Sequence, residues 1–138
     1  MTSALLPASD HIAVLDLATR YGLALDDWDF DAYLDCWADD GKLTIDHVGT
    51  FEGKAAIDAW IRDYRGVADG HRHHFSQHLL RSHGDNATTM RSYNLLIRIA
   101  GDDDLPHVRL SGVFRDKLRR DDTGWRFVER HLGEIVIR

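Results

Sequence analysis

Apolar residues recur at helical spacing through the first half of the chain. They repeat every three or four positions and form a single face in each of three segments, so we expect three amphipathic helices. Ser9 or Asp10 is the expected N-cap of the first helix, and Asp29 can cap the second. The expected helices cover residues 11–25, 30–38 and 54–67.

The second half of the chain alternates between apolar and polar positions, and turn-forming segments rich in Gly, Asp and Asn divide it. Long strands joined in series by short turns predict an antiparallel meander, and helices followed by strands are typical of an α+β fold. We expect the sheet to curl around the helices and to leave a cavity between them. The expected strands are 71–82, 87–99, 107–119 and 125–137, with a short one at 42–47.

Four aspartates lie close together in the segment ALDDWDFDAY, residues 24–33. Asp26 shares one helical stripe with Ala18 and Gly22, and these small residues leave room for a partner to approach its carboxylate. The other three aspartates lie on a polar flank or at the start of the second helix, where carboxylates cap free N–H groups. Asp26 is therefore the candidate functional carboxylate, although a surface role is the alternative.

Five of the nine histidines lie within residues 70–84. His74 and His78 fall on one face of an extended strand but about 13 Å apart, at about 3.3 Å per residue, which is too far for one metal ion. We therefore expect no metal site. Strand alternation groups these two histidines with Ser76 and Leu80, a mixture that suits the wall of a pocket. The alternative is that they are ordinary surface histidines.

Composition narrows the classes of function. A chain of 138 residues suggests one domain, residues 1–138, and a net charge of −6 without a basic run argues against nucleic acid and anionic membranes as partners. The single cysteine, Cys36, excludes an internal disulfide and fits a reducing cytoplasm. No apolar run approaches the about 20 residues that span a bilayer, and the start lacks a signal-peptide pattern. We expect a cytoplasmic protein that acts on a small molecule.

Five segments together resemble the SnoaL-like proteins of the nuclear transport factor 2-like superfamily. They are YGLALDDWDFDAYLDCWADDG, FEGKAAIDAWI, HHFSQHLLRSHGDNATTMRSY, LSGVFRDKL and GWRFVERHLGEI, and the resemblance covers residues 9–135. It is strongest toward the branch with scytalone dehydratase, bile-acid 7α-dehydratase and hexachlorocyclohexane dehydrochlorinase. The resemblance implies a cone-shaped α+β fold, in which a curved, mainly antiparallel sheet wraps around N-terminal helices and encloses a deep pocket.

The resemblance also implies a catalytic pair. In that branch, an aspartate at the end of the first helix works with a histidine early in the first long strand, and Asp26 and His74 match these positions. His74 would be the general base, and Asp26 would hold its tautomer and stabilise the imidazolium without any cofactor. Arg130 matches a late-strand arginine of the dehydrochlorinase and is the third expected catalytic residue.

The group that polarises the substrate is less defined. The pocket serine, asparagine and second histidine of scytalone dehydratase have no match in this sequence, and Leu25 stands where that enzyme has a catalytic tyrosine. Other polar and aromatic side chains could replace them. The expected substrate-binding residues are Tyr21, Trp37, His78, Tyr93 and His131.

Three functions are compatible with these features. The leading hypothesis is a cofactor-free, dehydratase-like lyase that removes a proton from carbon and expels a β-leaving group from a small hydrophobic or polyketide-like substrate. An isomerase or polyketide cyclase would use the same pair of residues. A non-catalytic binding or assembly module would need no such pair. The resemblance further implies a homo-oligomer, either a dimer or a trimer.

Overall fold

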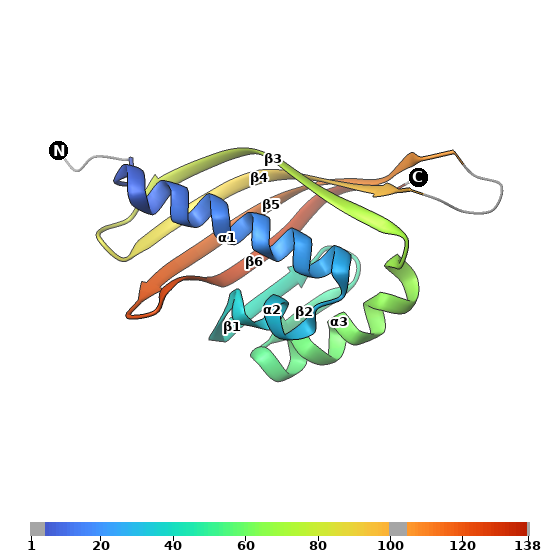
Figure 1. Cartoon of the computed structure of the whole chain (residues 1–138), viewed down its shortest axis with the longest axis horizontal. Coiled ribbons are helices and arrows are strands. Elements are labelled where there is room, and N and C mark those ends of the chain that lie inside the picture. Colours follow the sequence, from blue (N-terminus) through green and yellow to red (C-terminus); the bar gives the residue numbers. More distant parts are fainter. Residues whose placement is uncertain (1–4, 100–104, 138) are drawn as a thin grey trace.

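The computed structural model describes residues 5–99 and 105–137, and helices precede most of the sheet along the chain (Figure 1). None of the helices in these ranges combines the length and the apolar character needed to cross a membrane. The helices are α1 (Ala8–Asp27), α2 (Phe30–Asp35) and α3 (Lys54–Ala68). The strands are β1 (Trp37–Ile45), β2 (Gly49–Glu52), β3 (His71–Ser82), β4 (Ala87–Arg98), β5 (His107–Asp121) and β6 (Gly124–Ile137).

The strands of the described ranges form one sheet in the order β2-β1-β6-β5-β4-β3. Strands β3 to β6 make the predicted antiparallel meander, because each pairs antiparallel with the next strand along the chain. Strand β1 lies parallel to β6 and antiparallel to β2. The predicted α+β class, with its curved and mainly antiparallel sheet, is therefore confirmed.

The sheet arches over α1, while α2 and α3 lie beside β1 and β2 (Figure 1). Helix α1 buries the face that its periodicity predicts, including Val14, Leu17 and Leu25. The predicted N-cap is wrong, because the helix begins earlier and its N-cap is Pro7, which has no side chain able to accept a hydrogen bond. At the other end, Trp28 adopts a left-handed conformation with φ of 54°, which stops the helix directly after its acidic last turn.

Helix α2 has the predicted cap but ends sooner than predicted. Asp29 Oδ1 accepts a hydrogen bond from the Ala32 N–H at 3.1 Å. The residues from Trp37 onward belong to β1 because their backbone joins β6, where the Phe127 N–H donates to the Cys36 carbonyl at 2.9 Å. Sheet pairing here overrides the helical spacing of the apolar side chains.

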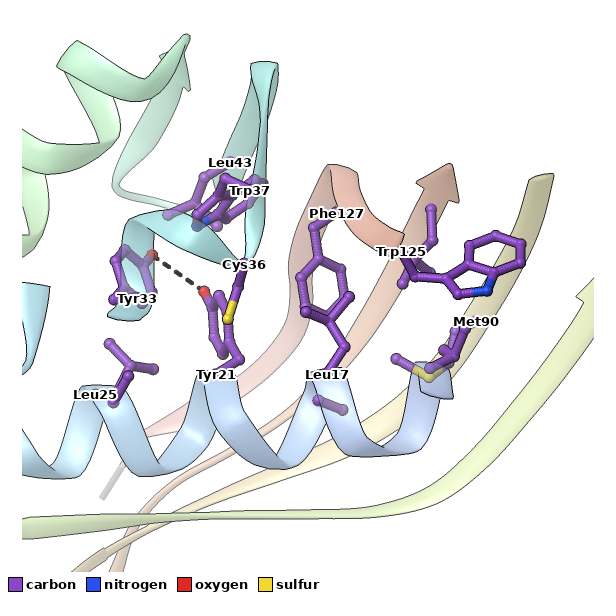
Figure 2. Packing of buried hydrophobic residues seen from close by; sticks show 14 of the residues in the cluster. Leu17, Tyr21, Leu25, Tyr33, Cys36, Trp37, Leu43, Met90, Trp125 and Phe127 are labelled. Atoms are coloured by element: carbon purple, nitrogen blue, oxygen red, sulfur yellow. Dashed lines mark hydrogen bonds between the residues drawn. The ribbon is translucent and has the colours of Figure 1, made fainter. Parts of the chain in front are cut away.

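Aromatic side chains pack between α1 and the sheet. Figure 2 shows the hydrogen bond of 3.2 Å that joins the hydroxyls of Tyr21 on α1 and Tyr33 on α2. The rings of Phe127 and Trp37 lie 5.3 and 6.1 Å from the Tyr21 ring, within the range of favourable aromatic pairs. This packing fixes the second half of α1, and with it Asp26, against the sheet.

Candidate active site

Asp26, in the last turn of α1, forms a hydrogen-bonded pair with His73 near the start of β3. Its Oδ1 lies 2.8 Å from His73 Nδ1 and also accepts the His73 backbone N–H at 3.0 Å. The two side chains are 17% and 7% exposed, respectively. One carboxylate therefore holds both the backbone and the ring of the same residue, which fixes the orientation of the imidazole.

The prediction that Asp26 pairs with His74 is wrong, because His74 lies on the opposite, exposed side of β3. The alternation before the middle of the strand puts His73 and Phe75 inward. A β-bulge follows, with Gln77 at φ of 57°, and after it Leu80 is buried. The sequence prediction grouped His74 with Leu80 and so placed it on the inner face, whereas the bulge reverses the alternation between the two residues.

His73 borders a cavity of about 480 Å³ between the sheet and α3. This volume suits a small organic molecule, and most of the wall is apolar, from side chains such as Leu25, Leu43 and Phe114. The other polar side chains at the wall are Tyr21, Asp46, His47, Asp63, Tyr64, His71, Asn94 and Arg109.

The two tyrosines at this cavity are neutral hydrogen-bonding groups. Burial, reinforced by Tyr21, raises the pKa of Tyr64 to about 12. Burial also raises the pKa of Tyr21, although the nearby Arg130 acts in the opposite direction. Because the Tyr21 hydroxyl is already paired with Tyr33, Tyr64 is the more available phenol.

A second, smaller cavity of about 260 Å³ lies between α1 and β3, on the other side of the pair. Asp26, His73, His74 and His78 all border it. Burial, together with the positive charge of Arg130, lowers the pKa of His78, and its buried Nε2 has no hydrogen-bond partner. Across residues 5–99 and 105–137, no group of three or more His, Cys, Asp or Glu side chains could hold a metal ion.

The family of this chain is evident from its sequence as well as its fold. The SnoaL-like domain matches residues 7–131. The chain belongs to the SnoaL-like family. This family includes cyclases, dehydratases and isomerases, and its members bind small-molecule substrates. The SnoaL-like fold, the pair and the cavity thus occur together in this chain.

Solved structures agree with this membership. The SnoaL-like chain is 26% identical to a protein of unknown function with a cystatin-like fold from Nostoc punctiforme, with 92% of both chains covered and a TM-score of 0.83. It is 27% identical to an NTF2-like protein from Novosphingobium aromaticivorans, covering 90% of this chain and 80% of that one, with a TM-score of 0.81. ActVI-ORFA from Streptomyces coelicolor is 25% identical, with 89% and 95% covered and a TM-score of 0.79. No curated protein matches the chain.

Arg130 does not reach either cavity of this SnoaL-like protein, contrary to its predicted catalytic role. Its guanidinium is completely buried and donates to both oxygens of Asp116, at 2.8 and 3.0 Å. Burial raises the pKa of the Asp116 carboxyl, and the two hydrogen bonds from Arg130 oppose that rise. The rings of Tyr21, Phe75, Phe114 and Phe127 surround the guanidinium at 3.8 to 5.5 Å. The arginine is therefore a structural residue of the core.

The expected substrate-binding residues of the SnoaL-like protein are dispersed. Tyr21 borders the main cavity, and His78 borders only the second one. Trp37 is wholly buried in the core because β1 begins there. Tyr93 is 42% exposed on the outer face of the sheet, under Arg91, since it alternates with the inward residues of β4. His131 is exposed and does not line the cavity, although it pairs at 2.6 Å with Asp46, which does.

Apart from Tyr21, the sequence prediction missed the polar residues at the main cavity, among them His73, Tyr64 and Asn94. Tyr64 lies on α3, where its side chain packs against the core and also forms part of the cavity wall. Asn94 had a detectable signal, because it is a polar residue at an inward position of β4 that is followed by the buried Leu96. The strand register is needed to show that Asn94 faces inward, and the sequence alone did not give that register.

Proposed function

We propose that this SnoaL-like protein is a cofactor-independent, dehydratase-like lyase in which His73, and not His74, is the general base. The observation that carries this proposal is the 2.8 Å hydrogen bond between Asp26 Oδ1 and His73 Nδ1 at the wall of a largely apolar cavity. Proton abstraction from carbon is favoured by an oriented base in a mostly apolar site, and the hydrogen bond and the apolar wall support this proposal.

Asp26 acts as the positioning residue of the pair. By accepting the Nδ1–H, its carboxylate leaves Nε2 as the ring atom that takes up a proton. The second hydrogen bond, from the His73 backbone N–H, keeps the carboxylate in place whether the imidazole is neutral or charged. Once His73 is protonated, the adjacent negative charge stabilises the imidazolium.

The proposed reaction balances without an external reactant. His73 Nε2 takes a proton from carbon, and the electrons of the broken C–H bond form a double bond to the neighbouring carbon. The bond from that neighbouring carbon to the leaving group breaks with its electron pair. If the leaving group is a hydroxyl, the imidazolium returns its proton to it, and water departs.

The substrate is a small and mostly apolar molecule, since a wall with few polar groups does not compensate the desolvation of a highly charged one. An isomerase or polyketide cyclase would share the proton abstraction and differ only in the later steps of the reaction. A purely binding role is disfavoured, because a scaffold gains nothing from a buried carboxylate–imidazole pair beside an open cavity.

Deuterium exchange tests the shared first step directly. Wild-type protein would be incubated in D₂O with cyclic β-hydroxy ketones and with the matching ketones that lack the hydroxyl, and deuterium at the α-carbon would be followed by NMR. We expect His73→Ala to lose about 100-fold or more of the exchange rate, the usual contribution of a positioned base. Asp26→Asn should also lose exchange, because the tautomer and the imidazolium are no longer stabilised.

His74→Ala is the matched control, since it removes a neighbouring histidine that has no hydrogen bond to Asp26. It should keep the wild-type rate. Wild-type exchange in His73→Ala would show that this histidine is not the base. Enone formed from the β-hydroxy ketone indicates the lyase, whereas exchange without enone indicates the isomerase or cyclase. Tight ketone binding with no exchange in any variant would indicate a binding module.

A further inference from the structure

Asn94 carries a buried side-chain amide that makes no hydrogen bond within the described protein. The residue is 3% exposed and borders the main cavity. Its Oδ1 is completely buried and has no partner, and no residue in the described ranges bonds to its Nδ2. Buried polar groups in folded proteins are almost always paired, so an unpaired amide at a cavity wall needs an explanation.

The surroundings of Asn94 favour an apolar residue on stability grounds. Met90, Ser92, Asn94 and Leu96 form the buried inner face of β4, and the neighbouring inward residue of β3 is Phe75. An amide loses its hydrogen bonds to water when it is buried here and gains none in return. The Nδ2 hydrogens, which no group in the described ranges accepts, are therefore available to donate to an acceptor oxygen of a ligand at the cavity wall.

The strand register places this amide next to the proposed base. His73 pairs with Leu96 and Phe75 pairs with Asn94, so His73 and Asn94 are diagonal neighbours on the inner face, about 7–8 Å apart at the backbone. Because both side chains project from the same face of the sheet, one small ligand can meet both of them, with one of its atoms hydrogen-bonded to Asn94 and an atom two covalent bonds away facing His73. A carbonyl oxygen and the α-carbon beside it are separated by two bonds.

We propose that Asn94 binds the carbonyl oxygen of the substrate, beside the carbon that His73 deprotonates, and so selects apolar ketones. This inference rests on the proposed function, because it assigns the group that receives the developing negative charge. The amide N–H would donate to that oxygen, and the hydrogen bond strengthens as the enolate forms. Tyr21 is less suited to the role because its hydroxyl is paired with Tyr33.

The test compares two probes of nearly the same shape. 2-Acetylnaphthalene has a carbonyl group that can accept a hydrogen bond, and 2-isopropenylnaphthalene has a C=CH₂ group in its place that cannot. Binding would be measured by fluorescence titration of the intact protein. Wild type should bind the ketone about tenfold more tightly, as expected for one hydrogen bond to an otherwise unpaired group. The infrared carbonyl stretch of the bound ketone should also shift to lower frequency.

Asn94→Leu should abolish both the ketone preference and the infrared shift, and it should unfold at the same or a higher temperature than wild type. Ser92→Ala is the matched control, because Ser92 is equally buried and unpaired on the same face but does not border the cavity. It should keep the preference. If Asn94→Leu does not fold, Asn94→Ala is measured in the same way.

A ketone preference that survives in the Asn94 variants overturns the assignment, as does a wild type that binds the two probes equally or binds neither. Because the readout is binding, it is independent of proton abstraction. His73→Ala and Asp26→Asn should still prefer the ketone. A retained preference combined with no deuterium exchange would therefore remove the proposed reaction and leave the role of Asn94 intact.

Discussion

Removing Asp116 should destabilise the protein severely, because it leaves the Arg130 guanidinium charged and buried without a counter-ion. Both side chains are 0% exposed and are joined by two hydrogen bonds. Breaking such a pair from one side costs about 3–5 kcal/mol, out of the about 5–15 kcal/mol that holds a typical domain folded. We therefore expect Asp116→Ala to lose between a fifth and nearly all of the free energy of unfolding.

The aromatic rings around Arg130 do not change this expectation. The four rings attract the guanidinium by about 2 kcal/mol or more when it is desolvated, but they do so in both wild type and Asp116→Ala. Their contribution therefore cancels from the comparison. Only the lost carboxylate, with its charge and its two hydrogen bonds, distinguishes the two proteins.

Urea unfolding, followed by circular dichroism and tryptophan fluorescence, measures the loss. The double variant Asp116→Leu/Arg130→Met removes both charges, and it should be close to wild type or more stable, since apolar replacements of buried ion pairs often are. A double-mutant cycle then isolates the coupling between the two side chains. A loss below about 1 kcal/mol in Asp116→Ala would refute the reasoning, as would a double variant no more stable than the single one.

Two further predictions concern stability alone. Because the pKa of folded His78 is lowered from 6.5, the unfolded chain binds its proton more readily, so stability should fall as the pH drops below about 6.5. His78→Gln should flatten this decline in urea midpoints measured between about pH 5 and 8, and an unchanged slope would contradict the assignment. Gly41→Ala should cost about 1–3 kcal/mol, because its Cβ would lie 2.7 Å from the wholly buried Trp37 ring and 3.0 Å from the Ala38 carbonyl oxygen. Its thermal unfolding tests this against Gly66→Ala, where a Cβ meets no atom within 4 Å.

The order of helices and long strands could be predicted from the sequence because each element has its own periodicity and is bounded by turn chemistry. The helix stripe also identified Asp26 correctly as a carboxylate turned toward the sheet. Strand alternation did not give the right histidine, because one extra residue at Gln77 exchanges the two faces and nothing in the local sequence marks it. The resemblance assigned Arg130 a catalytic role, but the register of β6 against β1 and β5 is irregular and the sequence does not show that this side chain is buried in the core.

The bulge at Gln77 also divides β3 into two parts that face different surroundings. Its neighbour β4 keeps one alternation throughout, from Met90 to Leu96, whereas β3 faces the cavity with odd-numbered residues before the bulge and the core with the even-numbered Leu80 after it. A single inserted residue thus separates the part of β3 that lines the cavity from the part that packs in the core. A substitution at His73, upstream of the bulge, changes the cavity wall, whereas a substitution at Leu80, downstream of it, changes the core.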